Sequence, residues 1–389
     1  MKWRHVPLGE VARVDRSSVA PEKICDGTTY VGLENIKSGG GFVDVTPVTR
    51  GQLASTKFVF GGEHVLYGKL RPYLAKIEAP DFAGVCSTDI LPIRPGPELN
   101  RRYLLHFLRQ PSQVALADSR SSGANLPRLS PAELERFAIP LPPLLEQRRI
   151  ASILDHAYTL RTKRRAAVTC LEELSQSIFV SMFSTDLEEA RTISLGEALS
   201  SIDSGRSPKC LKRSATHDEY GVLKLSAVTT GTYLSGENKA LPPDERFDQN
   251  NEVRDGDLLF TRKNTRDLVA ACAYVKTTPP RMLLPDLIFR LNLRAGSGLD
   301  PRYVQRVLMY PRIRKRVQRL AGGSAGSMPN ISKARLASVA IPRPSVDKQE
   351  QFRQRVEKVE DLKARLIEES SRGDALFASL QSRAFRGEL

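Results

Sequence analysis

Short runs of alternating or β-branched apolar residues, bounded by Gly, Pro and Asp, recur in both halves of the chain and predict strands. The runs cover residues 28–33, 64–70 and 89–95 in the first half and 220–228, 257–263 and 286–294 in the second half. Residues 103–111 and 303–311 predict short helices, each closed by a proline, because proline cannot continue a helix. The globular parts of the chain are therefore expected to be α+β.

A different pattern follows each globular part, where apolar residues recur at alternating intervals of three and four, as in a coiled coil. Residues 150–182 contain no Gly or Pro, and their apolar stripe is Ile150, Ile153, Ala157, Leu160, Ala167, Leu171, Leu174 and Ile178, interrupted only by Arg164. The second stripe is Phe352, Val359, Leu362, Leu366, Leu376 and Leu380, with Arg355, Glu369 and Gly373 also falling in it. Both segments predict long helices, which would bury their stripes most easily by packing antiparallel.

The two patterns belong to an internal repeat, which sets the unit that needs explaining. A shift of 202 positions aligns Pro140 with Pro342 and Gln147 with Gln349, and the opening VPLGEV at residues 6–11 returns as ISLGEA at residues 193–198. We expect an α+β fold of two pseudo-repeated globular domains separated by two long antiparallel coiled-coil helices. The expected boundaries are residues 1–143 for the first domain, 144–184 for the central helix, 185–345 for the second domain and 346–389 for the C-terminal helix.

Charge narrows the class of binding partner. The chain of 389 residues has a formal net charge of +15; residues 1–140 carry 18 basic and 14 acidic groups, and residues 184–342 carry 25 and 17. Such a surplus favours a polyanion such as nucleic acid, whose phosphates attract Lys and Arg through counterion release. A basic surface that serves only solubility is the alternative. No apolar run approaches the roughly 20 residues of a membrane span and the first residues lack a signal-peptide core, so a cytoplasmic location without membrane contact is expected.

The motifs that catalysis requires are missing from the sequence. There is no [DN]PP[YF] loop of an amino-methyltransferase, no P-loop and no HExxH, and no PD pair is followed by the acidic-x-Lys of a metal-dependent nuclease. The five cysteines form no CxxC pair, so neither zinc nor disulfides are indicated and buried free thiols are expected. We expect no catalytic residue and no metal ligand.

Two basic stretches and two Gly/Ser-rich loops are the candidates for DNA contact. Arg can pair with guanine or phosphate, Asn suits adenine, Lys adds charge, Tyr can pack on a sugar or base, and loop amides and hydroxyls can donate to phosphate. A solvated strand face and an ordinary flexible turn are the alternatives. The predicted DNA-binding residues are Lys69, Arg71 and Tyr73 of GKLRPYLAK, Ser122 and Asn125 of SSGANLPRLS, Arg262, Lys263, Asn264 and Arg266 of TRKNTR, and Ser324, Ser327 and Asn330 of GGSAGSMPNIS.

The order of these features resembles the specificity subunit of Type I restriction-modification systems over the whole chain. The stretches that carry the resemblance are PLPPLLEQRRIASILD, SQSIFVSMF, IPRPSVDKQEQF and the terminal LFASLQSRAFRGEL, with GKLRPYLAKI and STDILPIRP in the first domain. Repetition of the proline-rich segment makes the resemblance specific. The second copy departs from the first, since Ser345 replaces a proline and Glu350 and Gln351 replace Arg148 and Arg149.

The resemblance implies a DNA-recognition subunit without chemistry of its own. Each target-recognition domain would recognise one half of a bipartite double-stranded DNA target, while the helices set the spacing. Two modification subunits, adenine methyltransferases that bind S-adenosylmethionine, would dock on the helices, restriction subunits can join, and this chain itself would bind no cofactor. Gln147, Arg148, Arg149 and Gln349 are expected to contact these partners. A stand-alone DNA-binding regulator and a degenerate nuclease or methyltransferase are the alternatives; the duplication argues against the first and the missing motifs against the second.

Overall fold

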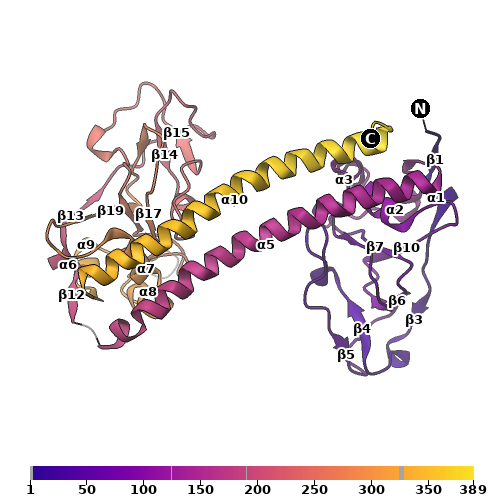
Figure 1. The fold of residues 1–389 in the computed structure, drawn as a ribbon, viewed down its shortest axis with the longest axis horizontal. Helices are drawn as coiled ribbons and strands as arrows, with labels where there is room; N and C mark the ends of the chain where they lie inside the picture. Colours follow the sequence, from indigo (N-terminus) through magenta and orange to yellow (C-terminus); the bar gives the residue numbers. More distant parts are fainter. Residues whose placement is uncertain (1–2, 124, 190, 324–327) are drawn as a thin grey trace. The chain divides into compact units, whose positions relative to one another are not determined.

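The computed structural model describes residues 3–123, 125–189, 191–323 and 328–389. The chain divides into two compact units, residues 1–168 with 365–389 (unit 1) and residues 169–364 (unit 2). The chain has two long helices, α5 (Leu144–Glu189) and α10 (Val346–Arg386) (Figure 1). One part of each helix belongs to unit 1 and the other part belongs to unit 2. Each unit is thus an α+β domain together with a segment of both helices; α5 extends beyond the expected end at residue 184, and α10 ends before residue 389.

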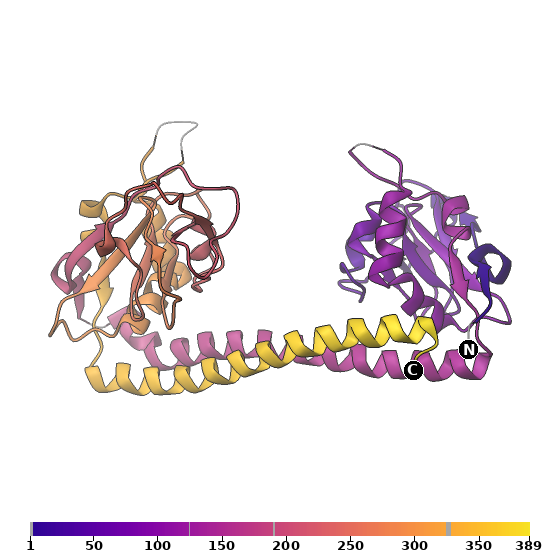
Figure 2. The same ribbon diagram turned by 90° about the horizontal axis from the view of Figure 1, so that it is seen from above.

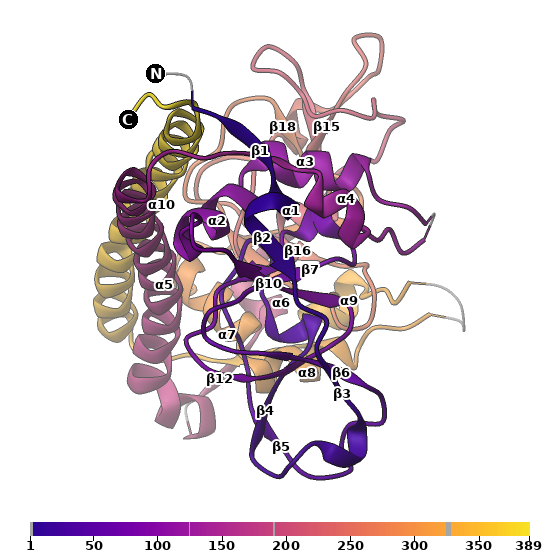
Figure 3. The ribbon, with the colours of Figure 1, turned by 90° about the vertical axis from the view of Figure 1, so that its right-hand side faces the viewer.

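The described residues of unit 1 form three sheets, which are mostly antiparallel. The four-stranded sheet has the order β2–β10–β7–β8, the five-stranded sheet has the order β3–β6–β9–β4–β5 with β4 and β9 parallel, and β1 pairs with β11. Strands β4 and β5 lie farther from helix α2 than β7 and β10 do (Figure 1 and Figure 3). The elements are β1 (His5–Pro7), α1 (Leu8–Val11), β2 (Ala12–Val14), β3 (Ser18–Val19), β4 (Thr28–Val31), β5 (Pro47–Val48), β6 (Lys57–Phe60), β7 (Val65–Gly68), β8 (Ile77–Glu78), β9 (Gly84–Cys86), β10 (Ile90–Pro95), α2 (Arg101–Leu108), α3 (Pro111–Ser119), α4 (Pro131–Glu135) and β11 (Ala138–Pro140).

Unit 2 repeats this topology in the same order along the chain. Its four-stranded sheet is β13–β19–β16–β17, a three-stranded sheet is β15–β14–β18 with β14 and β18 parallel, and β12 pairs with β20. The predicted strands of both halves are confirmed. The elements are β12 (Thr192–Ser194), α6 (Leu195–Ala198), β13 (Leu199–Ser204), β14 (Gly221–Leu223), β15 (Asn238–Ala240), β16 (Leu258–Thr261), β17 (Cys272–Tyr274), β18 (Met282–Leu283), β19 (Ile288–Leu293), α7 (Pro301–Met309), α8 (Pro311–Gln318), α9 (Lys333–Ala337) and β20 (Ala340–Pro342).

The short helices start from side-chain caps that the sequence supplies in both units. The carboxamide oxygen of Asn100 accepts from two backbone N–H groups of α2, and the carboxylate of Asp300 does the same for α7, which satisfies donors that a helix start leaves free. Pro111 and Pro311 close these helices as predicted, but each also opens a further helix, α3 or α8, which the sequence pattern did not predict. Proline fits the first turn of a helix, where its missing N–H is not needed.

The main core of each unit includes side chains from both long helices. In unit 1, Tyr103 of α2 packs with Ile150 of α5 and Phe385 of α10, and all three are buried. In unit 2, Phe183 of α5 packs against both Tyr303 of α7 and Phe352 of α10. Within each unit the two helix segments therefore lie side by side on the globular domain (Figure 2).

The seam between the helix segments differs from the predicted apolar stripe. Leu160 of α5 is 53% exposed, because Arg161 occupies the interface and places its guanidinium 4.4 Å from the centroid of the Phe377 ring. The Nε of Arg161 also donates to Asp374 at 2.6 Å. The stem and planar head of an arginine can thus replace an apolar contact. Four leucines that were predicted to lie in the buried stripe are exposed, so their assignment to it is wrong: Leu160, Leu174, Leu362 and Leu376.

Ion pairs in each unit show that the two helix segments run antiparallel. In unit 1, Arg165 of α5 pairs with Asp374 of α10, whereas Arg161, which comes earlier in α5, also lies against Phe377, which comes later in α10. In unit 2, Lys363 pairs with Glu172 at 2.6 Å and Lys348 pairs with Asp186. Within both units the antiparallel arrangement is confirmed.

The cysteines are free thiols but are not uniformly buried. Cys86 and Cys272 are buried in the two units, and burial raises the pKa of both thiols. Cys25 and Cys170 are exposed, so the expectation of burial is wrong for these two. None of the helices in the described part of the chain combines the length and the apolar character needed to cross a membrane.

Candidate nucleic-acid interface

The segment that follows β7 in unit 1 contacts the hairpin that precedes α4. The backbone N–H of Arg71 donates to the carbonyl of Pro127 at 2.8 Å. The hairpin closes through two backbone hydrogen bonds between Ser122 and Arg128, at 3.1 and 2.9 Å, and its described residues project from the body of the unit (Figure 2). The structure therefore brings together the two stretches of the first domain that were predicted to bind DNA.

The predicted side chains of this surface differ in their accessibility. Arg71 is exposed and has a left-handed backbone with φ of 51°, which starts the turn Pro72–Leu74, and Tyr73 in this turn is 50% exposed. Ser122 and Asn125 are exposed as well. Lys69 is half-buried, with its Nζ 3.8 Å from a carboxylate oxygen of Asp89. Arg71, Tyr73 and the hairpin residues are therefore the accessible part of the predicted set.

Arg128 is a further cation of this surface that sequence reasoning missed. Its side chain is 48% exposed, and its Nε lies 3.4 Å from Asp89, which thus neighbours both Arg128 and Lys69. The repeat would have identified it, because a shift of 202 positions places Arg128 at Asn330, which was predicted.

Unit 2 builds the same arrangement from its own residues. The backbone N–H of Ile331 donates to the carbonyl of Arg262, which follows β16, at 2.8 Å. Asn330 and Gly322 close the hairpin by two backbone hydrogen bonds of 2.8 and 3.0 Å. Ser324 and Ser327, which were also predicted to bind DNA, lie outside the described residues.

Two predicted DNA-binding residues of unit 2 bind each other. The Nε of Arg262 donates to the carboxamide oxygen of Asn330 at 3.0 Å, and its guanidinium lies 4.9 Å from the centroid of the Phe289 ring. Both side chains are half-buried. This pair fastens the hairpin to the end of β16, whereas Arg266 is exposed and Lys263 is half-buried in the same segment.

The structure contradicts the prediction that Asn264 contacts DNA. Its side chain is 7% exposed. The carboxamide nitrogen donates to the hydroxyl of Thr229 at 3.3 Å, and the carboxamide oxygen accepts from the N–H of Thr265 at 2.8 Å. The amide is therefore occupied by partners inside the unit. A dense run of polar residues in a sequence does not reveal which of them point inward.

The structure also contradicts a direct partner contact for Gln147 and Gln349, which are 0% and 1% exposed. The carboxamide of Gln147 accepts from the N–H of Asn100 and donates to the carbonyls of Glu98 and Pro142, at 2.8 to 2.9 Å. In unit 2, the carboxamide of Gln349 accepts from the N–H of Asp300 and donates to the carbonyls of Gly298 and Pro344. Both glutamines tie the start of a long helix to the cap of a short helix, which is a structural role.

The neighbouring arginines of the first helix remain accessible. Arg148 is exposed, and Arg149 is 53% exposed beside Glu146, at 2.8 Å. At the equivalent place in unit 2, Glu350 pairs with Arg353 instead. The two helix starts thus present different charges.

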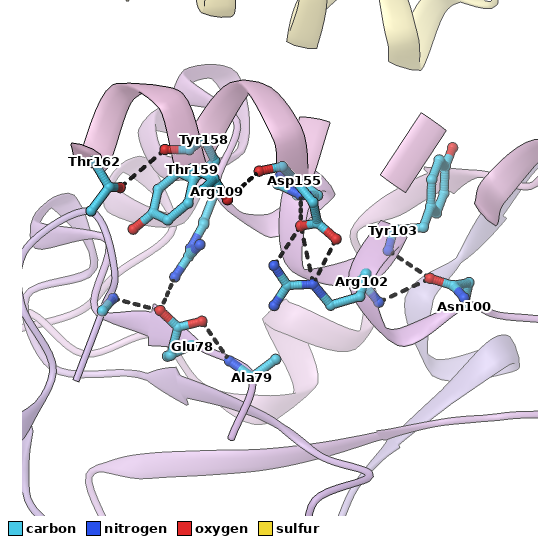
Figure 4. Close-up of polar contacts among 12 residues, drawn as sticks. Glu78, Ala79, Asn100, Arg102, Tyr103, Arg109, Asp155, Tyr158, Thr159 and Thr162 are labelled. Carbon is cyan, nitrogen blue, oxygen red and sulfur yellow. Dashed lines mark hydrogen bonds and ion pairs between the residues drawn. The ribbon is translucent and has the colours of Figure 1, made fainter. Parts of the chain in front are cut away.

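An ion-pair network joins α2 to α5 in unit 1 (Figure 4). The Nε of Arg102 lies 3.1 and 3.0 Å from the two carboxylate oxygens of Asp155, and the Nε2 of His106 lies 2.7 Å from the first of them. Burial opposes ionisation of Asp155, but the hydrogen bonds from His106 and Arg102 outweigh it and lower its pKa to about 2. Asp155 therefore stays ionised and holds α2 on α5.

A second ion pair joins the end of α2 to the sheet. Arg109 donates to Glu78 of β8 at 2.6 Å, and its guanidinium lies 5.1 Å from the centroid of the Tyr158 ring on α5 (Figure 4). Glu78 also accepts from the backbone N–H of Gly41 at 2.5 Å. The helix, the sheet and the loop around Gly41 are thus mechanically connected.

In the described ranges, no cluster of three or more His, Cys, Asp or Glu side chains is placed to hold a metal ion. The chemistry that the exposed residues offer is hydrogen bonding and charge, from Arg71, Arg128 and the hairpin in unit 1 and from Arg266 in unit 2. Such groups suit phosphates and base edges.

Comparison with known sequences identifies proteins that are similar to parts of this chain. Residues 1–169 match the family model of the Type I restriction modification DNA specificity domain. The specificity subunit of the Type I restriction enzyme EcoKI, from Escherichia coli K12, is 26% identical over 318 residues, which are 76% of this chain and 67% of that protein. The specificity subunit of the Type I enzyme EcoEI, from Escherichia coli, is 32% identical over 151 residues, 39% of this chain and 25% of that protein.

A solved structure shares the fold over nearly the whole chain. The S subunit of a Type I restriction-modification system from M. genitalium superposes with a TM-score of 0.62 at 13% identity, and the match covers 99% of this chain and 96% of that chain. At this identity the match shows the fold alone, with its two globular domains and long helices.

Proposed function

We propose that this chain, which belongs with the specificity subunits of Type I restriction-modification systems, is the DNA-recognition component of such a system. Each unit recognises one half of a bipartite double-stranded DNA target. The observation that carries the proposal is the duplication of one surface: in both units the segment after the third strand of the four-stranded sheet hydrogen-bonds residues that close a hairpin or follow it directly. Both copies stand in basic halves of the chain, as DNA contact requires.

The two surfaces differ in their residues, which is what two different half-sites need. Unit 1 offers Arg71, Tyr73 and Arg128, whereas unit 2 offers Arg266 and keeps Arg262 bound to Asn330. Since base edges are distinguished by the donors and acceptors of the protein, unlike residues on like scaffolds favour unlike sequences.

The chain acts without chemistry of its own, and partner subunits supply the reaction. We infer that two modification subunits, which bind S-adenosylmethionine and methylate adenine, dock on the long helices, that restriction subunits can join, and that the complex works in the cytoplasm. This chain needs no cofactor for its task, which is to place the target sequence before the methyltransferases. Arg148 and Arg149 remain candidates for this docking because they are exposed.

Exposed leucines on the helices support docking of two equivalent partners. Leu160 and Leu174 of α5 are 53% and 43% exposed, and the repeat aligns them with Leu362 and Leu376 of α10, which are 48% and 59% exposed. Of these four leucines, Leu160 and Leu376 belong to unit 1, and Leu174 and Leu362 belong to unit 2. Single exposed apolar side chains are common on protein surfaces, so it is the repetition at equivalent positions that makes these leucines candidates for docking.

Deletion of the gene from its source cell, followed by mapping of methylated adenines in genomic DNA, tests the proposal. The account predicts that one bipartite sequence loses its methylation and regains it on complementation. Unchanged methylation at every site in the deleted strain would refute the proposed function.

A further inference from the structure

Helix α8 of unit 2 carries a concentration of positive charge that its counterpart in unit 1 lacks. The residues from Pro311 to Arg319 read PRIRKRVQR, whereas those from Pro111 to Ser119 read PSQVALADS. The two helices occupy equivalent places, since each starts at a proline after the first short helix and buries one residue at the seventh position, Val317 or Ala117. The fold itself therefore does not require these cations.

Two of the cations in α8 have structural partners. Arg314 donates through Nη2 to the carbonyl of Asp267 at 3.3 Å, and Gln318 donates to the same carbonyl and to that of Val269, both at 3.1 Å. Arg316 donates to the carbonyl of Ala340. Helix α8 is thus fastened directly to the end of the segment that contains Lys263 and Arg266.

The other three cations, Arg312, Lys315 and Arg319, form an exposed stripe. Their spacing of three and four places them on one face of the helix, away from the buried Ile313 and Val317. For these three side chains, no hydrogen bond or ion pair with another residue of the described ranges was found. The equivalent residues of unit 1 are Ser112, Ala115 and Ser119, which are uncharged and also exposed.

We propose that Arg312, Lys315 and Arg319 bind the phosphate backbone of double-stranded DNA beside the half-site that unit 2 recognises. The inference rests on the proposed function, because the stripe gains this role from the recognition segment to which α8 is fastened. Phosphate contacts are independent of sequence and add affinity and orientation rather than specificity. Unit 2 would therefore hold its half-site with more backbone contacts than unit 1, which compensates for the mutual pairing of Arg262 and Asn330.

Unit 1 supplies the substitutions for the test. The triple variant Arg312→Ser, Lys315→Ala, Arg319→Ser introduces the residues that the equivalent helix already tolerates. DNA binding by the full complex with modification subunits is measured at several salt concentrations. One duplex contains the target sequence that the complex methylates, and the other duplex lacks it. We expect about a 10- to 100-fold loss of affinity on both duplexes and a salt slope reduced by about two to three, since each lost phosphate contact removes roughly 0.9. The triple variant and the unaltered complex should methylate the same sequence.

Two control variants separate this effect from net charge and from damage to the fold. Arg312→Lys with Arg319→Lys keeps the charges and should retain the affinity and the slope. The variant Arg16→Ser, Lys23→Ala, Arg50→Ser removes three exposed cations of unit 1 and should change the slope much less. An equal loss in this control would assign the effect to net charge and overturn the inference.

The outcomes distinguish this inference from the proposed function. If the unaltered complex does not prefer the target duplex, the proposed function fails. If it prefers the target and the triple variant keeps its full salt slope, only the inference about α8 fails. If the triple variant instead loses a protein subunit from the complex, the stripe binds an acidic protein surface and the inference is likewise overturned.

Discussion

The ring of Phe385 packs against the ring of Tyr103 with 4.8 Å between their centroids, although the two residues lie far apart in the sequence. The repeat produces the same pair in unit 2, where Phe183 lies 4.8 Å from Tyr303. The hydroxyls of Tyr103 and Tyr303 donate to the carbonyls of Pro140 and Pro342. Each unit is therefore completed by the last turns of a long helix, and α10 closes unit 1.

Replacement of Phe385 by Ala should destabilise unit 1 selectively. The side chain is 7% exposed, so its truncation should cost about 3 kcal/mol or more of unfolding free energy. Hydrogen exchange should accelerate at residues 101–108, and the matched variant Phe183→Ala should accelerate it at residues 301–309 instead. Leu376→Ala serves as a control, because that side chain is exposed and its loss should leave both regions protected. Equal acceleration of both regions by either Phe variant would contradict the assignment.

Substitution of the exposed leucines of one unit should remove one partner. The variant Leu160→Glu, Leu376→Glu places two charges on the proposed docking surface of unit 1 without opening a core. Native mass measurement should then find one modification subunit in place of two, and Leu174→Glu with Leu362→Glu should have the same effect through unit 2. Retention of two subunits in both variants would place the docking surface elsewhere.

The Asp155 carboxylate should make the stability of unit 1 depend on acid. Its folded-state pKa is lowered from 3.8 to about 2, so its contribution is present above about pH 4 and is lost as the pH falls toward 2. Asp155→Asn should unfold at lower urea than the unaltered protein at pH 7, and the difference should shrink below pH 4. A difference that stays constant down to pH 3 would show that ionisation of Asp155 does not stabilise the fold.

The length of the long helices should determine the gap between the two half-sites. Insertion of four residues after Ala166, matched by four after Glu368, adds about 6 Å to each helix, or about two base pairs at roughly 3.4 Å each. Four residues preserve the seam better than two, although a stutter remains. Methylome sequencing should find the same half-site bases with a longer gap. Altered bases with an unchanged gap would contradict the role of the helices as spacers.

Sequence reasoning predicted the elements well where periodicity is strong, and failed where polar side chains decide the packing. The repeat, the strands and the long helices followed from apolar spacing. The seam did not, because Arg161 rather than Leu160 packs on Phe377, and a hydrophobicity pattern assigns the buried position to the leucine. Among the predicted site residues, Arg71 and Tyr73 are accessible, whereas burial of Asn264 and Gln147 depends on partners distant in sequence.

Selection of bound duplexes from a randomised pool, with the assembled complex, tests the central claim that each unit recognises one half of the target. The unaltered complex should enrich two defined blocks separated by a fixed number of undefined bases. Arg71→Ala with Arg128→Ala should erase information from one block only, Arg266→Ala should weaken the other block, and the gap should stay the same. A single continuous sequence, or equal loss in both blocks from the unit 1 variant, would contradict the account.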